Sequence, residues 1–273
     1  MTRREARAPE QRMPGEDRAS TRTAEHPRAG PAPDLSVVVP VYRNASTLEE
    51  LAARLAQVLA LSATSYEVIF VEDASPDNAR EVLARLTQTH PEVKAVHHTR
   101  NRGQHRAALA GLAYARGTWT VVMDGDLQDP PEAVPLLLAK AAEGFAVVFA
   151  ARRGTYESPG RLRTSHAFKW LLARLLHLPV DAGMFMALDR RMLRLLLEMH
   201  GPPPFLVAMV ACLNPPLASV PIERATRPRG RSAYSSLARL RAASAGLAWA
   251  VAKRVGWLNA WSYAAPPASA AEN

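Results

Sequence analysis

The Asp124-Gly-Asp126 turn carries the side chains best suited to chemistry in this sequence. It follows the apolar run at 118–123, where nothing favours two neighbouring negative charges except a bound cation. Mg²⁺ and Mn²⁺ take oxygen ligands, often one or two carboxylates plus substrate phosphates, and Gln128 adds an amide oxygen. The turn therefore predicts a divalent metal site. An ordinary acidic turn in which Asp129 caps the next helix is the alternative interpretation.

Alternating strands and helices must position this turn. We expect strands at 35–40, 66–71, 93–98, 118–123 and 145–150, with helices at 47–61, 77–90, 104–116 and from 132 to 143. In the first helix apolar residues recur at spacings of three and four, and Ser46 or Thr47 can cap its first turn. The alternation predicts an α/β fold with a mostly parallel twisted sheet flanked by helices, whose ligands bind at the carboxyl ends of the strands.

Composition narrows the class of protein and its partners. The chain has 273 residues, of which 48% are hydrophobic, and a formal net charge of +9, which implies an anionic partner. Its one cysteine, Cys212, cannot form an internal disulfide and favours a reducing compartment. We find no apolar run of about 18 residues and no signal peptide, so we expect a cytoplasmic protein. Residues 1–33 are expected to form a disordered basic tail.

Several arginines follow the predicted metal turn in the sequence. Arg152 and Arg153 end the strand that follows this turn, and Arg161 and Ser165 are four residues apart, on one face of a predicted helix. The guanidinium fork matches the oxygens of a phosphate group. These residues predict a cradle for a phosphate-bearing acceptor, and a solvated basic surface is the alternative.

The order and spacing of four motifs resemble the inverting glycosyltransferases of family two, which have the GT-A fold. The motifs are Val39-Pro-Val-Tyr42, Glu72-Asp73-Ala-Ser75-x-Asp77, Asn101-Arg-Gly-Gln-His105 and Asp124-Gly-Asp-Leu-Gln-Asp-Pro-Pro131. The resemblance covers residues 34–235. Within the family, these motifs look like those of the polyprenyl-phosphate sugar transferases, such as the dolichyl-phosphate mannose synthases and the undecaprenyl-phosphate aminoarabinose transferases.

The resemblance implies a role for each matched residue. Asp73 would hold the nucleobase or ribose, and Pro40 and Tyr42 would line the base pocket. Asp124 and Asp126 would hold the sugar nucleotide and its Mg²⁺ or Mn²⁺, with Gln128 completing the metal shell. The residues that would contact a lipid phosphate are Arg152, Arg161, Ser165, Arg227 and Ser232.

The resemblance implies transfer of a sugar from a UDP- or GDP-sugar to a polyprenyl phosphate at the inner face of the membrane. The acceptor phosphate would be the nucleophile, and the metal would neutralise the departing diphosphate. A soluble transferase with a small-molecule or glycan acceptor is the alternative, favoured by Ala233 where the family commonly has Lys. A nucleic-acid-binding protein is a remote alternative, because no recognised nucleic-acid module accompanies the basic residues.

Residues 236–273 are predicted to be a basic amphipathic segment and tail. Its apolar residues are interleaved with Arg239, Arg241, Lys253 and Arg254, a pattern typical of an interfacial helix whose cations reach toward lipid headgroups. These apolar residues are Leu237, Leu240, Leu247, Trp249, Val251, Val255 and Trp257. A helix that packs on the domain or on a partner is the alternative. Because we find no membrane-spanning run in the sequence, attachment to a membrane would be peripheral.

Overall fold

The computed structural model describes residues 31–153, 173–179, 181–224 and 236–256. Most of the predicted tail, at 1–30, lies outside the described residues. The same holds for four of the predicted acceptor residues, which are Arg161, Ser165, Arg227 and Ser232.

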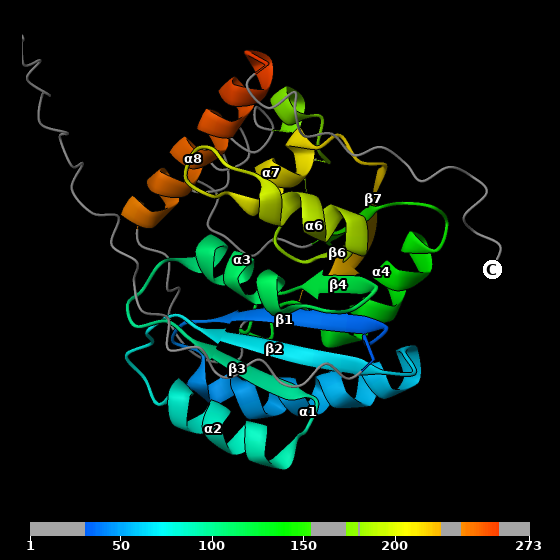
Figure 1. Cartoon of the computed structure of the whole chain (residues 1–273), viewed down its shortest axis with the longest axis vertical. Helices are drawn as coiled ribbons and strands as arrows, with labels where there is room; N and C mark the ends of the chain where they lie inside the picture. The colour runs from blue at the N-terminus through cyan, green and yellow to red at the C-terminus, as the bar shows by residue number, and fades with distance from the viewer. Residues whose placement is uncertain (1–30, 154–172, 180, 225–235, 257–273) are drawn as a thin grey trace, which may run out of the picture.

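A seven-stranded sheet runs through the described part of the chain (Figure 1). In spatial order its strands are β3 (Val93–His97), β2 (Tyr66–Glu72), β1 (Leu35–Val41), β4 (Trp119–Val122), β6 (Met186–Asp189), β5 (Val147–Arg153) and β7 (Leu217–Glu223). Within this sheet β6 pairs antiparallel with both neighbours, and the other pairs are parallel. The carboxyl ends of the other six strands therefore share one edge. The predicted α/β class with a mostly parallel sheet is confirmed.

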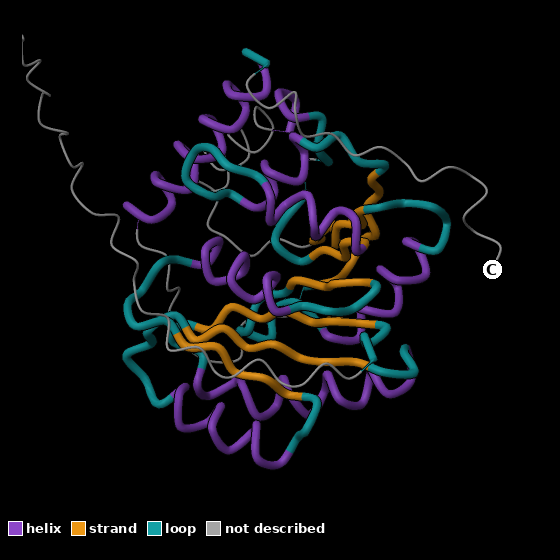
Figure 2. The backbone as a smooth tube through the Cα atoms, in the orientation of Figure 1, coloured by secondary structure: helices purple, strands orange, loops and turns teal. Residues whose placement is uncertain are grey.

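Helices cover both faces of the sheet (Figures 1 and 2). One face carries α1 (Ala45–Ser62), α2 (Ala79–Thr89), the 3₁₀ turn η1 (Pro131–Ala133) and α4 (Val134–Ala141). The opposite face carries α3 (Gln104–Tyr114), α6 (Arg190–Glu198), α7 (Leu206–Cys212) and α8 (Ser236–Arg254). The central strands are buried on both faces, which is why β1 reads as a continuous apolar run rather than an alternating one.

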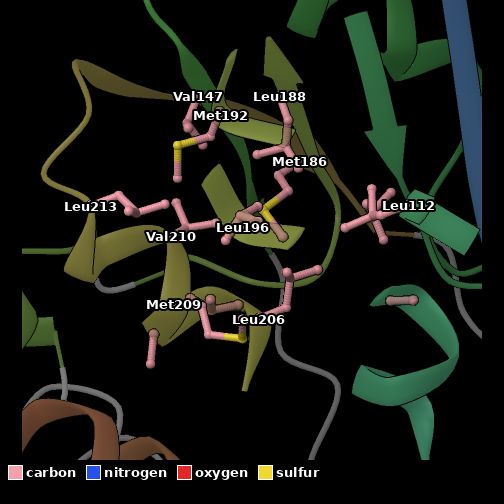
Figure 3. Packing of buried hydrophobic residues seen from close by; sticks show 14 of the residues in the cluster. Leu112, Val147, Met186, Leu188, Met192, Leu196, Leu206, Met209, Val210 and Leu213 are labelled. Atoms are coloured by element: carbon pink, nitrogen blue, oxygen red, sulfur yellow. The ribbon is translucent and has the colours of Figure 1, made fainter. Parts of the chain in front are cut away.

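Two hydrophobic clusters follow from this layering. Along β1, Val37 and Val39 pack into the cluster under α1, whereas Val38 packs into the cluster under α3. Figure 3 shows part of the second cluster, where Met186 and Leu188 of β6 meet Leu196 of α6. Successive strand residues point to opposite faces, so each central strand contributes to both clusters.

Helix α8 packs against the domain through Trp249, which is 1% exposed. The indole Nε1–H donates to the carbonyl oxygen of Pro203 at 3.0 Å. The prediction of an interfacial helix is therefore wrong for Trp249, because this side chain fills a space inside the domain. Leu247, Val251 and Val255 are exposed on the same helix. Among the described residues, none of the helices is both long enough and apolar enough to span a bilayer.

Candidate active site

The acidic turn lies at the carboxyl edge of the sheet, directly after β4. Asp124 is partly exposed, whereas Asp126 is buried, with Oδ1 accepting a hydrogen bond from the backbone N–H of Gln128 at 3.2 Å. Leu127, between Asp126 and Gln128, has a φ of 58°, a left-handed conformation that costs a non-glycine residue about 1 kcal/mol or more. The buried Leu127 side chain, 2% exposed, helps to keep the turn in this conformation.

Strained backbone also occurs in the two neighbouring loops at this edge. Arg43, after β1, has a φ of 58°, and Ala74, after β2, has a φ of 49°. Non-glycine residues rarely adopt such angles, and they cluster at binding sites because the surrounding structure must hold them there. Three adjacent loops with this feature mark the carboxyl edge as the candidate site.

Side chains from two helices hold the acidic turn from within the domain. The Thr47 hydroxyl of α1 lies 2.6 Å from the carbonyl oxygen of Gly125 and donates to it. On the other side, the Gln104 side-chain amide donates to Oδ1 of Asp124. The turn is therefore anchored through both its backbone and its first carboxylate.

Two ion pairs hold the segment after the turn. Asp129 is fully buried, and its Oδ1 lies 3.5 Å from Nε of Arg224, just after β7. At the surface Arg54 of α1 makes two hydrogen bonds to the Glu132 carboxylate, at 2.9 and 2.7 Å. The residue at the N-cap position of η1 is Pro130, and the alternative role of Asp129 as a helix cap stays a prediction.

The loops after β1 and β2 are joined by a second network. The backbone N–H of Arg43 donates to the Ser75 hydroxyl at 2.7 Å, and this hydroxyl donates to Oδ1 of Asp77 at 2.6 Å. The other oxygen of Asp77 accepts from the backbone N–H of Ala45, the first residue of α1, at 3.0 Å. The predicted cap by Ser46 or Thr47 is therefore wrong, because Asp77 binds the first free N–H group of this helix.

The predicted base-pocket residues lie on the first of these loops. Pro40 is buried within β1, and Tyr42 is partly exposed, with the Arg43 guanidinium 5.4 Å from the centre of its ring. This distance is within the range of a cation–π interaction. Tyr42 therefore offers an aromatic ring beside a cation at the sheet edge.

Asp73, the predicted nucleotide-binding carboxylate, lies below the surface of this edge. It is 2% exposed and accepts hydrogen bonds from Nδ1 of His98 at 2.7 Å and from the backbone N–H groups of Arg102 and Gly103 at 2.8 and 2.7 Å. Burial alone would raise the pKa of Asp73, but these hydrogen bonds outweigh it and lower the pKa below its ordinary value. Contact with a nucleobase stays a prediction for this residue.

His105 follows at the start of α3 and is held as a neutral side chain. Its Nδ1 accepts a hydrogen bond from the backbone N–H of Leu206 at 3.3 Å, and its ring lies 4.7 Å from the ring of Phe205. Burial lowers the pKa of His105 to about 4, because the charged imidazolium is disfavoured away from water. The arrangement fits a structural role that joins α3 to α7.

Basic residues occur at the carboxyl ends of β5 and β7. Arg152 and Arg153 end β5 and pair in register with Ile222 and Glu223 of β7, and Arg224 follows directly. Because both strands run parallel to β4, these residues lie at the same edge as the acidic turn. The topology therefore brings the acidic turn and the predicted acceptor residue Arg152 to one edge of the sheet.

The donor set of the acidic turn fits a hard divalent cation that also binds phosphate. Asp124, Asp126 and Gln128 supply only oxygen donors from the protein side chains. Among the described residues there is no group of three or more His, Cys, Asp or Glu side chains placed to hold a metal ion. Mg²⁺ and Mn²⁺ are commonly held by one or two carboxylates together with substrate phosphates, which is what this set can provide.

Sequence reasoning missed the residues that hold the turn. The motif that contains Gln104 predicts no role for this residue, and the sequence predicts Thr47 only as a helix cap. Arg224 lies before the motif that contains Arg227 and received no role. The only signal for Gln104 and Thr47 was their place after strands that end at the same edge, and their actual partners depend on the tertiary structure.

Sequence comparison identifies the family to which this α/β fold and its acidic turn belong. The sequence model described as Glycosyl transferase family 2 matches residues 36–197. The chain belongs to glycosyltransferase family 2.

Two curated relatives are themselves described as uncharacterized glycosyltransferases. The chain is 33% identical over 202 residues to YkcC of Bacillus subtilis, covering 73% of this chain and 62% of that protein. It is 31% identical over 205 residues to sll0501 of Synechocystis, covering 74% of this chain and 64% of that protein. The chain thus spans a little under two thirds of the length of these relatives.

Solved structures share the fold. Glucosyl-3-phosphoglycerate synthase from Mycobacterium tuberculosis, in complex with Mn²⁺, UDP and glucosyl-3-phosphoglycerate, matches with a TM-score of 0.58 and 22% identity over 82% of this chain and 80% of that chain. The mannosyltransferase PcManGT from Pyrobaculum calidifontis, in complex with GDP-mannose and Mn²⁺, matches with a TM-score of 0.56 and 21% identity, over 86% of this chain and 66% of that chain.

Proposed function

We propose that this protein is a metal-dependent inverting glycosyltransferase that uses a nucleoside diphosphate sugar and transfers the sugar to a polyprenyl phosphate. The observation that carries the proposal is the acidic turn of Asp124 and Asp126 at the same sheet edge as the arginines that end β5. An anionic donor and an anionic acceptor both need such a combination of metal ligands and cations.

The donor occupies the part of the edge formed by β1 and β4. Tyr42 and Pro40 line the side that receives the base, and Asp124, Asp126 and Gln128 lie where the diphosphate binds. Bound Mg²⁺ or Mn²⁺ supplies a Lewis acid that stabilises negative charge on the departing diphosphate. The structural neighbours support this part of the proposal, since one binds UDP and another GDP-mannose, each with Mn²⁺.

The acceptor phosphate acts as the nucleophile in this proposal. One of its oxygens forms a bond to the anomeric carbon while the bond from that carbon to the donor diphosphate breaks, and the electron pair leaves with the nucleoside diphosphate. A phosphate anion needs no base to deprotonate it, so cations that orient it are sufficient. Arg152, Arg161, Ser165, Arg227 and Ser232 are the residues that we assign to this task.

A small phosphorylated acceptor is the second candidate. Glucosyl-3-phosphoglycerate synthase, which shares the fold, has been solved with phosphoglyceric acid bound. Such an acceptor also carries a phosphate that arginines can bind, but its nucleophile is a hydroxyl, whose proton must go to a base. The two candidates therefore differ in the atom that attacks, although both use a phosphate for recognition.

Peripheral attachment to a membrane is part of the first candidate. The exposed Leu247, Val251 and Val255 of α8 lie four residues apart and hence along one face of that helix, with Arg254 beside them. Apolar side chains flanked by cations favour the headgroup region of an anionic bilayer. We assign this face of α8 to the cytoplasmic side of the membrane.

Acceptor choice is tested by initial rates with Mn²⁺ and a panel of UDP- and GDP-sugars. The acceptors are undecaprenyl phosphate, undecaprenol, 3-phosphoglycerate and glycerate, so that each phosphorylated compound has a control that lacks the phosphate. Transfer to undecaprenyl phosphate but not to undecaprenol supports the first candidate. Transfer to 3-phosphoglycerate alone supports the second, and transfer to neither acceptor with any donor contradicts both.

A further inference from the structure

Asp73 and Asp124 lie at the same sheet edge, after β2 and β4, and the segment between β3 and α3 connects them. The Asp73 carboxylate accepts the backbone N–H groups of Arg102 and Gly103. The next residue, Gln104, donates its side-chain amide to Asp124. Asp73 therefore holds the backbone at Gly103, and the side chain of the next residue, Gln104, reaches Asp124.

Gly103 is the turning point of this connection. Its φ is +90°, and a Cβ atom added there would meet nothing within 4 Å, so the glycine is needed for its backbone conformation rather than for space. Helix α3 begins at the next residue, and the carbonyl oxygen of Gly103 accepts the N–H of Ala107 at 3.0 Å. The Gly103 peptide therefore sets the direction in which Gln104 extends.

The interactions of Asp73 suit it to hold this peptide firmly. Its Oδ1 accepts from His98 and Arg102, and its Oδ2 accepts from Gly103. Hydrogen bonds to an ionised carboxylate are about twice as strong as neutral ones, and a buried carboxylate is screened little by water. The backbone N–H of Asp73 also donates to the carbonyl oxygen of Val41 at 3.0 Å, which fixes the carboxylate relative to β1.

We propose that Asp73 is a positioning residue for the metal ligand Asp124 and acts through Gly103 and Gln104. This inference rests on the proposed function for the presence of a metal, and it replaces the direct base contact that the family resemblance implies for Asp73. Hydrogen bonds that orient a ligating carboxylate typically change metal affinity by about 10- to 100-fold. Loss of either Asp73 or Gln104 should therefore disturb the orientation of the Asp124 carboxylate in the same way.

The test compares the wild-type chain with Asp73→Asn, Gln104→Ala and the double variant. An asparagine has one carbonyl oxygen in place of two carboxylate oxygens, so at least one of the three donors loses its acceptor. The affinity for Mn²⁺ at saturating UDP or GDP is measured from the electron paramagnetic resonance signal of free Mn²⁺. We expect each single variant to weaken Mn²⁺ binding about tenfold, and the double variant to be no weaker than the worse single variant.

Binding of uridine and guanosine in EDTA separates positioning from base contact. These nucleosides lack phosphates, so their affinity does not depend on the metal site. We expect it to be unchanged in Asp73→Asn. Weaker nucleoside binding with unchanged Mn²⁺ affinity would overturn the proposal in favour of a base contact, and additive losses in the double variant would show that the two residues act independently. Exposed Glu81→Gln and Gln57→Ala serve as matched controls.

Hydrogen exchange in the metal-free protein tests the same connection without any ligand. The backbone N–H of Gln128 is bonded to Asp126, so it reports on the order of the acidic turn. Faster exchange of this amide in both Asp73→Asn and Gln104→Ala is expected, and unchanged exchange in both overturns the proposal. Failure of the wild-type chain to bind UDP or GDP with Mn²⁺ would contradict the proposed function. Hydrogen exchange of the Gln128 amide would still show whether Asp73 and Gln104 order the acidic turn. Gln104 is partly exposed, so its alanine variant keeps the test usable if Asp73→Asn does not fold.

Discussion

Arg224 lies with its Nε 3.5 Å from Oδ1 of Asp129, and this ion pair joins the acidic turn after β4 to the end of β7. Asp129 is fully buried, whereas the Arg224 side chain is 19% exposed. A buried carboxylate depends strongly on its cation, because water cannot replace the lost interaction. The pair therefore fixes the position of the predicted metal site relative to β7.

Replacing Arg224 should destabilise the protein. Arg224→Ala leaves the buried Asp129 carboxylate without this cation, and we expect the free energy of unfolding to fall by about 3 kcal/mol. Asp129→Asn in the same background should recover part of the loss, because the buried charge is removed. Urea denaturation of both single variants and the double variant measures this coupling. If Arg224→Ala lowered the free energy of unfolding equally with and without Asp129→Asn, the pairing would be contradicted.

The metal prediction concerns Asp126. Asp126→Asn keeps an oxygen that can accept the N–H of Gln128 but removes the charge, so the fold should remain while sugar transfer falls about 100-fold or more. Activity should also be lost in excess EDTA and return with Mn²⁺ or Mg²⁺. Glu132→Gln is the control, since this carboxylate lies on the same segment but pairs with Arg54. Near-normal turnover by folded Asp126→Asn would count against the proposed metal role.

Burial of His105 predicts a pH dependence of stability. Its pKa is about 4 in the folded protein and about 6.5 unfolded, so between these values the unfolded chain binds more protons. The stabilising contribution is complete above about pH 6.5 and is lost as the pH falls toward 4. Between pH 7 and pH 4.5 the free energy of unfolding should fall by roughly 2–3 kcal/mol more in the wild type than in His105→Gln. Urea denaturation at both values measures the difference, and parallel curves would show that His105 is not the cause.

The two sides of α8 should respond differently to substitution. Trp249→Ala removes a buried side chain and should cost about 3–5 kcal/mol of stability, whereas Leu247→Ser with Val251→Ser changes exposed positions and should cost little. The serine variant should nevertheless bind anionic vesicles more weakly, with a salt dependence that reflects the nearby cations. Vesicle sedimentation measures binding. Identical sedimentation of the serine variant and the wild type would contradict the membrane assignment of this face.

Much of the fold follows from local sequence patterns. The apolar run at 35–40 and the helical spacing after it predict β1 and α1 to within two residues, because burial on both sides of a parallel sheet demands continuous apolar strands. The strand predicted at 145–150 is instead found at Val147–Arg153. That shift extends the strand through Arg153 because its backbone pairs with β7, a partner about 70 residues away along the chain.

The sequence by itself predicts the chemistry of the turn at Asp124 and Asp126, since two carboxylates after a buried strand favour a cation wherever the rest of the chain lies. Only the tertiary structure decided which groups hold that turn. Gln104 reaches Asp124 and Arg224 reaches Asp129 because the sheet brings the ends of β3, β4 and β7 to one edge. Such contacts join residues 20 to 95 positions apart in the printed sequence, and no local periodicity encodes them.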